Sequence, residues 1–348
     1  MGAAAFFFLF SPGSLTAVRF GEAFIIMKNI RKNGDLDMKY SGIGGQAVLE
    51  GVMMKNGSRY AVAVRKPDKT IEVKKDEYKS FSERYKICSL PLIRGVFSFV
   101  DSLILGMGTL NWSASFYEEE GEPKNEKKDA MIMGLATVLA VVLAVGLFMM
   151  LPVFLSNLLK PLISSVTVLS LVEGFIRLVL FILYVVAISL MEDIRRVYMY
   201  HGAEHKCINC LEHGLILNKE NVMKSSKEHK RCGTSFLLLI MLISILLFTL
   251  LHVEGLWLRM LSRVLLIPVV AGLAYEFLRA AGRSDNCLIN ALSKPGLWLQ
   301  GLTTKEPDED MVEVAIASVE AVFDWRAYLK ENFDVDVPEE AGEMSDVQ

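Results

Sequence analysis

The chain has 348 residues, a formal net charge of −3, 52% hydrophobic and 22% charged residues, and a mean hydropathy of +0.37. This composition excludes a disordered chain and disfavours an ordinary soluble domain, so much of the polypeptide is expected to lie in lipid. The slightly acidic balance gives no electrostatic basis for binding nucleic acid. Five scattered cysteines, an odd number, do not form a disulfide scaffold and indicate a reduced, cytosol-facing placement.

The first segment, residues 1–38, is an unassigned N-terminal extension. It carries a short apolar run with no Lys or Arg before it, which is atypical of a signal peptide. Met27 and Met38 are alternative starts. A translated upstream extension and a targeting element are therefore both open for this segment.

Residues 39–89 are expected to form a β-rich cytoplasmic segment. Residues 46–54 are apolar and tolerate a strand, Asn56-Gly57 is a hairpin signal, and residues 59–66 alternate in polarity before a turn at Pro67-Asp68. These features predict a β-meander of about three strands. The preceding glycines, 42–45, lack the Gly-Lys-Ser/Thr ending of a phosphate loop, so they indicate a flexible or closely packed backbone.

Residues 90–129 are expected to contain an interfacial or re-entrant helix followed by a charged linker. The apolar stretch at residues 90–110 is interrupted by Arg94 and Asp101. A spanning helix is the alternative. It would move the basic segment before it to the outside, which the distribution of positive charge disfavours.

Four further segments are long and apolar enough to cross a bilayer as helices. They are residues 130–155 and 166–191, within a first pair at 130–191, and residues 236–253 and 256–281, within a second pair at 236–281. Between the second and third segments lie eight Lys and Arg, whereas the other two links hold one and none. The positive-inside rule then places both termini and the long middle link in the cytoplasm. The predicted fold class is an α-helical integral membrane protein with a small cytoplasmic β-meander.

The middle link, residues 192–235, is expected to be a cytoplasmic loop rich in His and Cys. His201 and His205 are four residues apart, so on a helix they share one face and could bind one metal ion. Glu204 lies beside them and could act as a general base. The order His-x-x-Glu-His is the inverted form of the zincin motif. We therefore predict a divalent metal site, with zinc as the expected ion.

The third metal ligand has several candidates. His229, Cys232 and Glu276 could each supply it, and Glu212 competes with them. Cys207-x-x-Cys210 has zinc-ligand spacing, but small apolar filling near a helix end is the simpler interpretation of these thiols. Arg231 or Arg279 could stabilise an oxyanion.

Ionisable residues within the predicted spans form a second signal. Glu173 and Arg177 are four apart and Glu276 and Arg279 three apart, so each pair can meet on one helix face. Because charges in lipid are costly, such residues indicate either a paired strut or a functional cavity.

Residues 282–333 form a predicted cytoplasmic segment with an amphipathic helix. The helix begins near Pro307-Asp308-Glu309 and carries apolar residues at helical spacing from Val312 to Phe323. Residues 334–348 are acidic and are expected to form a disordered tail.

Three motifs together resemble those of the YqhQ family of bacterial membrane proteins. They are residues 44–54 (GGQAVLEGVMM), 200–206 (YHGAEHK) and 231–236 (RCGTSF). The resemblance extends over residues 40–323 and implies a multi-pass protein of the bacterial cytoplasmic membrane, described as a predicted metal-dependent enzyme. Cys207 and Cys210 lie outside the family motifs, as do the first 38 residues.

Three hypotheses of function follow. The first is a metal-dependent hydrolase that acts at the cytoplasmic membrane surface, with the bilayer as its partner. The second is a transporter or channel component in which homo-oligomers close a pore lined by Glu173, Arg177, Glu276 and Arg279. The third is a membrane scaffold with a structural metal. A P-loop is absent from the sequence, so no nucleotide is expected.

Overall fold

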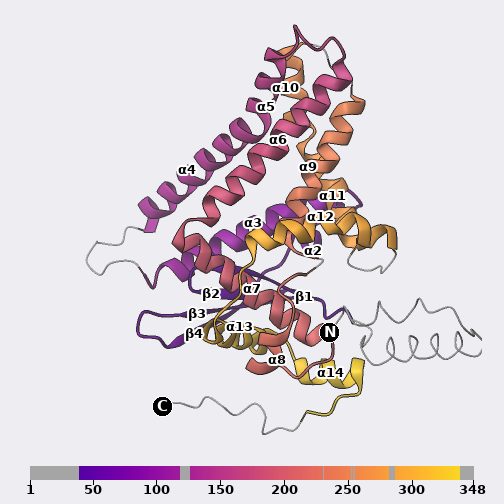
Figure 1. The fold of residues 1–348 in the computed structure, drawn as a ribbon. Helices are drawn as coiled ribbons and strands as arrows, with labels where there is room; N and C mark the ends of the chain where they lie inside the picture. Colours follow the sequence, from indigo (N-terminus) through magenta and orange to yellow (C-terminus); the bar gives the residue numbers. More distant parts are fainter. Residues whose placement is uncertain are drawn as a thin grey trace, which may run out of the picture. The chain divides into compact units, whose positions relative to one another are not determined.

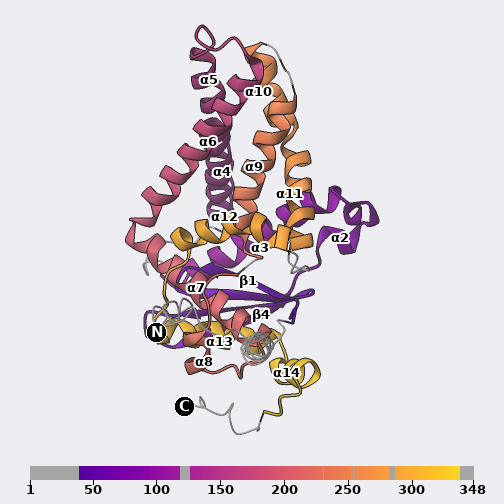
Figure 2. The same cartoon turned by 45° about the vertical axis from the view of Figure 1, so that its right-hand side comes forward.

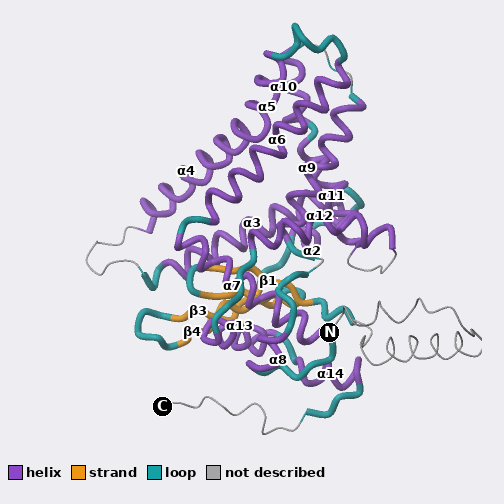
Figure 3. The backbone as a smooth tube through the Cα atoms, in the orientation of Figure 1, coloured by secondary structure: helices purple, strands orange, loops and turns teal. Residues whose placement is uncertain are grey.

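The computed structural model describes residues 39–117, 126–229, 231–251, 253, 255–281 and 287–337. The chain divides into two compact units, Met1–Lys39 and Tyr40–Gln348, and all the described helices and strands belong to the second. The fold is mostly helical with one small sheet (Figure 3). The predicted N-terminal extension and all but the first four residues of the predicted acidic tail lie outside the described residues.

The sheet is a meander of four antiparallel strands in the order β1-β2-β3-β4. The strands are β1 (Ile43–Val48), β2 (Gly51–Asn56), β3 (Arg59–Arg65) and β4 (Ile71–Glu77). The β2–β3 hairpin pairs Asn56 with Arg59, as the Asn-Gly signal predicts. The prediction of three strands was wrong because residues 46–54 form two strands, separated by a turn in which Glu50 adopts φ 50°. An apolar run cannot by itself reveal such a turn.

Both faces of the sheet are covered by helices. Val52, Met54, Ala61 and Ala63 point into a core shared with α7 (Glu192–Glu212) and α13 (Glu309–Val322). The alternate residues, including Met53 and Val62, point to the other face and pack with Leu105 of α3 (Ile93–Ala114). The central strands are therefore apolar on both sides, as a sheet between two helical layers requires.

Helix α3 lies across the base of the helical bundle, between the bundle and the sheet (Figures 1 and 2). It follows α2 (Phe81–Arg84) and the short 3₁₀ helix η1 (Lys86–Ser89). Its length and hydropathy would suffice for a membrane span. However, Asp101 is buried and accepts a hydrogen bond of 2.7 Å from the Tyr78 hydroxyl, which ties α3 to the end of β4. These contacts fix α3 against the sheet, and its interfacial position stays a prediction.

The helical bundle of Figure 1 contains the most apolar helices, with mean hydropathies of 2.4 to 2.8. Helix α4 (Glu126–Val145) continues through a π-helical turn η2 (Gly146–Met150) into α5 (Leu151–Leu158), and α6 (Val166–Ser189) and α9 (Gly233–Leu250) follow. With α3, the part of the chain that the structure describes has four helices that are long and apolar enough to cross a membrane by length and composition.

The last predicted span, residues 256–281, is broken rather than continuous. Helices α10 (Leu256–Leu265) and α11 (Ile267–Ala281) meet at an angle of 44°. Pro268 lies in the first turn of α11, where its missing N–H costs no intrahelical hydrogen bond. The prediction of one continuous helix was therefore wrong.

The predicted His/Cys-rich loop is largely helical, because α7 occupies its first 21 residues and α8 (Lys219–Lys224) follows. Helix α7 ends at Glu212, with His213 as its C-cap. Gly214 follows with φ 73°, and Leu215 N–H donates to the Cys210 carbonyl as in a Schellman motif. The predicted amphipathic C-terminal helix is confirmed as α13. The segment also contains α12 (Cys287–Thr303) and α14 (Trp325–Phe333), which the sequence did not indicate.

Candidate metal centre

Three potential metal ligands meet where α7 passes the start of α9. One donor atom from each of His201, His205 and Cys232 lies within 4.8 Å of the other two. The two histidines come from consecutive turns of α7, as predicted, and their ring centroids are 4.4 Å apart. Cys232 is the N-cap of α9, and its Sγ lies 3.3 Å from Nε2 of His201. Among the four candidates for the third ligand, the structure brings Cys232 to the histidine pair.

Backbone carbonyl groups orient both imidazoles. Nδ1 of His201 lies 3.0 Å from the Thr303 carbonyl oxygen, and Nδ1 of His205 lies 2.7 Å from that of Lys227. Each Nδ1 is then the protonated donor, so each Nε2 carries a lone pair. This arrangement is typical of metal-binding histidines, whose second nitrogen is almost always fixed by a carbonyl or carboxylate.

The orientation of His201 depends on two close contacts between the backbone of α7 and the segment that follows α12. The segment after α12 runs directly against α7, where Lys305 N–H donates to the Tyr198 carbonyl at 2.9 Å. A Cβ atom on Gly202 would lie 2.0 Å from the Lys305 carbonyl oxygen, so only glycine permits this contact. The segment thereby brings the Thr303 carbonyl to His201.

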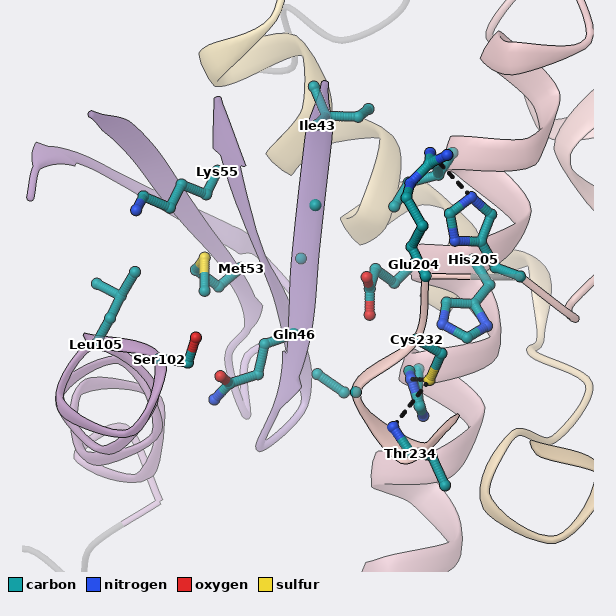
Figure 4. A pocket seen from close by; sticks show the side chains of 18 of the residues that line it. Ile43, Gln46, Met53, Lys55, Ser102, Leu105, Glu204, His205, Cys232 and Thr234 are labelled. Atoms are coloured by element: carbon teal, nitrogen blue, oxygen red, sulfur yellow. Dashed lines mark hydrogen bonds between the residues drawn. The ribbon is translucent and has the colours of Figure 1, made fainter. Parts of the chain in front are cut away.

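Glu204 lies on the flank of α7 that faces β1, next to the histidine pair (Figure 4). Burial raises the pKa of its carboxyl to about 7, although His201 and a hydrogen bond from the Gly45 backbone act in the opposite direction. A Cβ on Gly45 would lie 2.9 Å from Cγ of Glu204 and 2.7 Å from the Met53 carbonyl oxygen. The closely packed backbone expected at these glycines is thus present at Gly45. A carboxyl group with a pKa near neutrality is suited to general acid–base chemistry.

A cavity of about 800 Å³ adjoins the three donors. It follows the edge strand β1, with Glu204, His205 and Cys232 on one side and Ser102 and Leu105 of α3 on the other (Figure 4). The cavity therefore lies between α3 and the three potential metal ligands.

His229 belongs to a separate network beside the metal-ligand group. Its Nε2 lies 3.3 Å from Oε2 of Glu212, and the same carboxylate accepts from Arg231 and from Ser41. Burial lowers the pKa of His229 and would raise that of Glu212, but hydrogen bonding from His229 and the Arg231 charge bring the Glu212 pKa to about 2. Arg231 lines the cavity, with its guanidinium stacked 4.4 Å from the Tyr40 ring centroid. The structure thus gives His229 and Glu212 positioning contacts rather than a place among the three donors.

Glu276 also lies outside the three-donor group. Its carboxylate pairs with Arg94 of α3, with Nε to Oε1 at 2.6 Å. This pairing arises because the fold places α3 against α11. The charge of Arg279, the partner expected from the sequence, also acts on Glu276, and Arg279 lines a second cavity beside Arg94.

The remaining predicted residues have clear places. Glu173 and Arg177 form the predicted i,i+4 pair at 2.9 Å. Cys207 and Cys210 are fully buried in the core beneath the sheet, and burial raises the pKa of both thiols, that of Cys210 to about 12. They are apolar filling, as the simpler interpretation held.

Sequence reasoning missed the groups that orient the ligands. The carbonyls of Thr303 and Lys227 carry no side-chain signal, so no pattern could reveal them. Gly45 and Gly202 do stand within or beside the recognised motifs, and a glycine in the middle of a helix is itself a signal of a close approach.

Comparison with known proteins gives a family but no activity. A family model described as "Protein of unknown function (DUF1385)" matches residues 90–325, which include all three donors. "Uncharacterized protein YqhQ" of Bacillus subtilis (strain 168) is 37% identical over 300 residues, which cover 83% of this chain and 94% of that protein. No solved structure matches the chain.

Proposed function

The chain belongs to the YqhQ (DUF1385) family, and from that premise we propose that it is a membrane-embedded, metal-dependent hydrolase. The single observation that carries the proposal is the convergence of His201, His205 and Cys232 beside the buried carboxyl of Glu204. Three protein ligands with a fourth position left for another group are typical of catalytic rather than structural zinc sites.

The donor set fits zinc better than a harder ion. Imidazole nitrogen and thiolate sulfur are ligands that zinc prefers, whereas magnesium and manganese prefer oxygen. Zinc bound there would supply Lewis-acid activation of a water molecule or of a substrate oxygen. Glu204 would hold or accept a proton at its carboxylate, and the cavity along β1 would admit the substrate. Arg231 lines the same cavity but is paired with Glu212, so we assign it to positioning first and to oxyanion stabilisation only if that pair opens.

The site lies at the foot of an apolar helix, which supports action at a membrane surface. Cys232 directly precedes α9, whose 18 residues have a mean hydropathy of 2.5. We propose that α4–α5, α6, α9 and the α10–α11 pair enter the bilayer, that α3 lies at its surface, and that the sheet with both termini lies in the cytoplasm. The eight basic residues between α6 and α9 support this orientation.

The two rival functions receive less support. A polar path through the bundle would need its charged residues to line one route, but Glu173 pairs within α6 and with α10 whereas Glu276 pairs with α3. A purely structural metal would favour four protein ligands, and the described residues bring three together.

Metal analysis of the detergent-purified full chain tests the proposal. Wild type, prepared without chelator, should retain stoichiometric zinc, and His205→Ala should lose it. His213→Ala is the matched control, because His213 ends the same helix with an exposed ring that lies 2.7 Å from the Asn209 carbonyl. Equal metal content in wild type and His205→Ala would refute the site.

A second experiment separates metal binding from catalysis. Glu204→Gln should retain the metal and lose turnover in a panel of ester, amide and phosphate-ester substrates. A variant that keeps the wild-type rate would remove Glu204 as the base. Absence of turnover in the wild type across the panel, with metal bound, would favour the scaffold hypothesis.

A further inference from the structure

Three arginines and one glutamate meet inside the bundle, in its half distant from the sheet. Glu173 Oε1 accepts from Arg177 and from Arg263 Nε, each at 2.9 Å, and Oε2 accepts from Arg259 Nη2 at 2.6 Å. All four side chains are at most 5% exposed. We call these four residues the arginine cluster. Glu173 and Arg177 belong to α6, and Arg259 and Arg263 belong to α10.

The charges of the arginine cluster do not balance. Three guanidinium groups face one carboxylate, and among the described residues no other carboxylate lies within ion-pair distance of any of the three. Arginine does not lose its proton in proteins, so it cannot become neutral to relieve the imbalance. An uncompensated charge in a low-dielectric interior is costly, and the surplus in this cluster calls for a further anion.

Two N–H groups of the cluster also have no acceptor. Arg259 Nε and Arg263 Nη1 are buried and have no hydrogen-bond partner among the residues that the structure describes. Arg177, by contrast, donates from Nε to the Phe148 carbonyl and from Nη1 to Ser244 Oγ, each at 2.9 Å. Because buried polar groups nearly always have hydrogen-bond partners, the two unpaired N–H groups indicate that a further acceptor binds beside them.

The surroundings hold the guanidinium groups in place. Arg177 and Arg263 both stack on the buried ring of Phe248, at 5.2 and 4.1 Å from its centroid. The carbonyl that binds Arg177 belongs to η2, and π-helical turns inside α-helices are frequent at functional sites. The arginines are thus fixed in position before any further anion binds.

We propose that the arginine cluster binds an oxyanion of the phosphate class, either the phosphate of a lipid head group or free phosphate. Guanidinium forks match the oxygens of phosphate, and Nε and Nη1 are the donors left for it. The apolar face of α10, with Trp257, Leu258 and Leu261 exposed, would lie against lipid. Entry of the anion requires α10 to shift. This helix is bounded by Gly255, which adopts φ 84°, and by the bend before Ile267. This inference does not depend on the metal centre.

Two measurements on the full chain in detergent test the proposal. The first is the Tm as inorganic phosphate is added at constant ionic strength, with chloride as the reference anion. The second is the amount of phospholipid retained after exhaustive detergent washing, measured by mass spectrometry of the lipid extract. A saturable rise in Tm with phosphate indicates the free ion. Stoichiometric retained phospholipid, without a phosphate effect, indicates the lipid head group.

Three variants make the test decisive. Arg263→Gln should abolish the phosphate effect and the lipid retention, whereas Arg195→Gln, at an exposed position on α7, should keep both. Since Arg263→Gln could fail to fold, Ser156→Asp is the complementary variant. The Ser156 hydroxyl lies 3.3 Å from Arg259 Nη2, so a carboxylate there should replace the missing anion, raise the Tm and remove any dependence on added phosphate.

Some results would overturn the proposal. They are a wild type that neither responds to phosphate nor retains phospholipid, or a Ser156→Asp variant that is less stable than wild type and keeps the phosphate response. In the first case the arginine cluster would need no bound anion.

Discussion

Replacing Glu212 by Gln removes one negative charge from a fully buried position while keeping the shape of the side chain. The carboxylate accepts from Ser41 N–H at 3.0 Å, from Ser41 Oγ at 2.8 Å, and from His229 and Arg231. It thereby connects Ser41, in the segment before β1, to the segment that leads into Cys232. We expect Glu212→Gln to destabilise this part of the protein and to weaken metal retention.

The size of the effect follows from the pKa. The Glu212 pKa falls from 4.5 to about 2 on folding. At about 1.4 kcal/mol per pKa unit, the preference for the charged form contributes about 3 kcal/mol to the free energy of unfolding. Because the folded-state pKa is depressed, this contribution is complete above the unfolded-state pKa of about 4.5 and is lost as the pH falls towards 2.

The assay is thermal unfolding of wild type and variant in the same detergent between pH 7 and pH 2. A loss of about 3 kcal/mol corresponds to roughly 6–12 °C in Tm for a unit of moderate size. The difference in Tm should be largest at pH 7 and shrink below pH 4.5. Glu220→Gln, at an exposed ion pair on α8, should leave the Tm unchanged. A difference for Glu212→Gln that stays constant down to pH 2 would show that charge is not its source.

Three further predictions concern packing, charge and reactivity. Gly202→Ala should displace the segment at Lys305 and lower metal affinity by about 10–100-fold, as loss of ligand orientation does in other sites, which a competitive zinc titration measures. Glu173→Gln should cost about 3–5 kcal/mol, because it leaves buried guanidinium groups unpaired, and the loss should appear as a lower Tm. Cys207 and Cys210, buried and held as thiols, should resist maleimide until the protein unfolds, which mass spectrometry can follow.

The first of these predictions has a control variant, and each of the three has a result that would contradict it. Gly44→Ala, where a Cβ would meet nothing within 4 Å, should bind zinc as wild type does. If it weakens binding as much as Gly202→Ala, the close approach at residue 202 is not the cause. A Glu173→Gln variant as stable as wild type would mean that the arginines are solvated. Rapid labelling of either buried cysteine under native conditions would contradict the packing described for α7.

The local features of the sequence predicted the local features of the structure. The period of His201, Glu204 and His205 placed them together on a helix because α-helical geometry alone fixes which side chains are neighbours. The same reasoning predicted the Glu173–Arg177 pair, the hairpin at Asn56 and α13, since each depends on residues close in sequence. Hydropathy likewise identified the apolar helices, because their length and composition are read directly from the chain.

Contacts between distant segments were decided only by the tertiary structure. The choice of Cys232 as the third donor depends on where α9 begins relative to α7, and the Glu276–Arg94 pair depends on α3 packing against α11. The arginine cluster arises because Arg259 and Arg263 of α10 reach Glu173 of α6, 86 and 90 residues earlier in the chain. Spacing along the chain cannot specify such contacts, because they depend on how whole helices pack, and helix packing is set by the summed fit of many side chains rather than by any one motif.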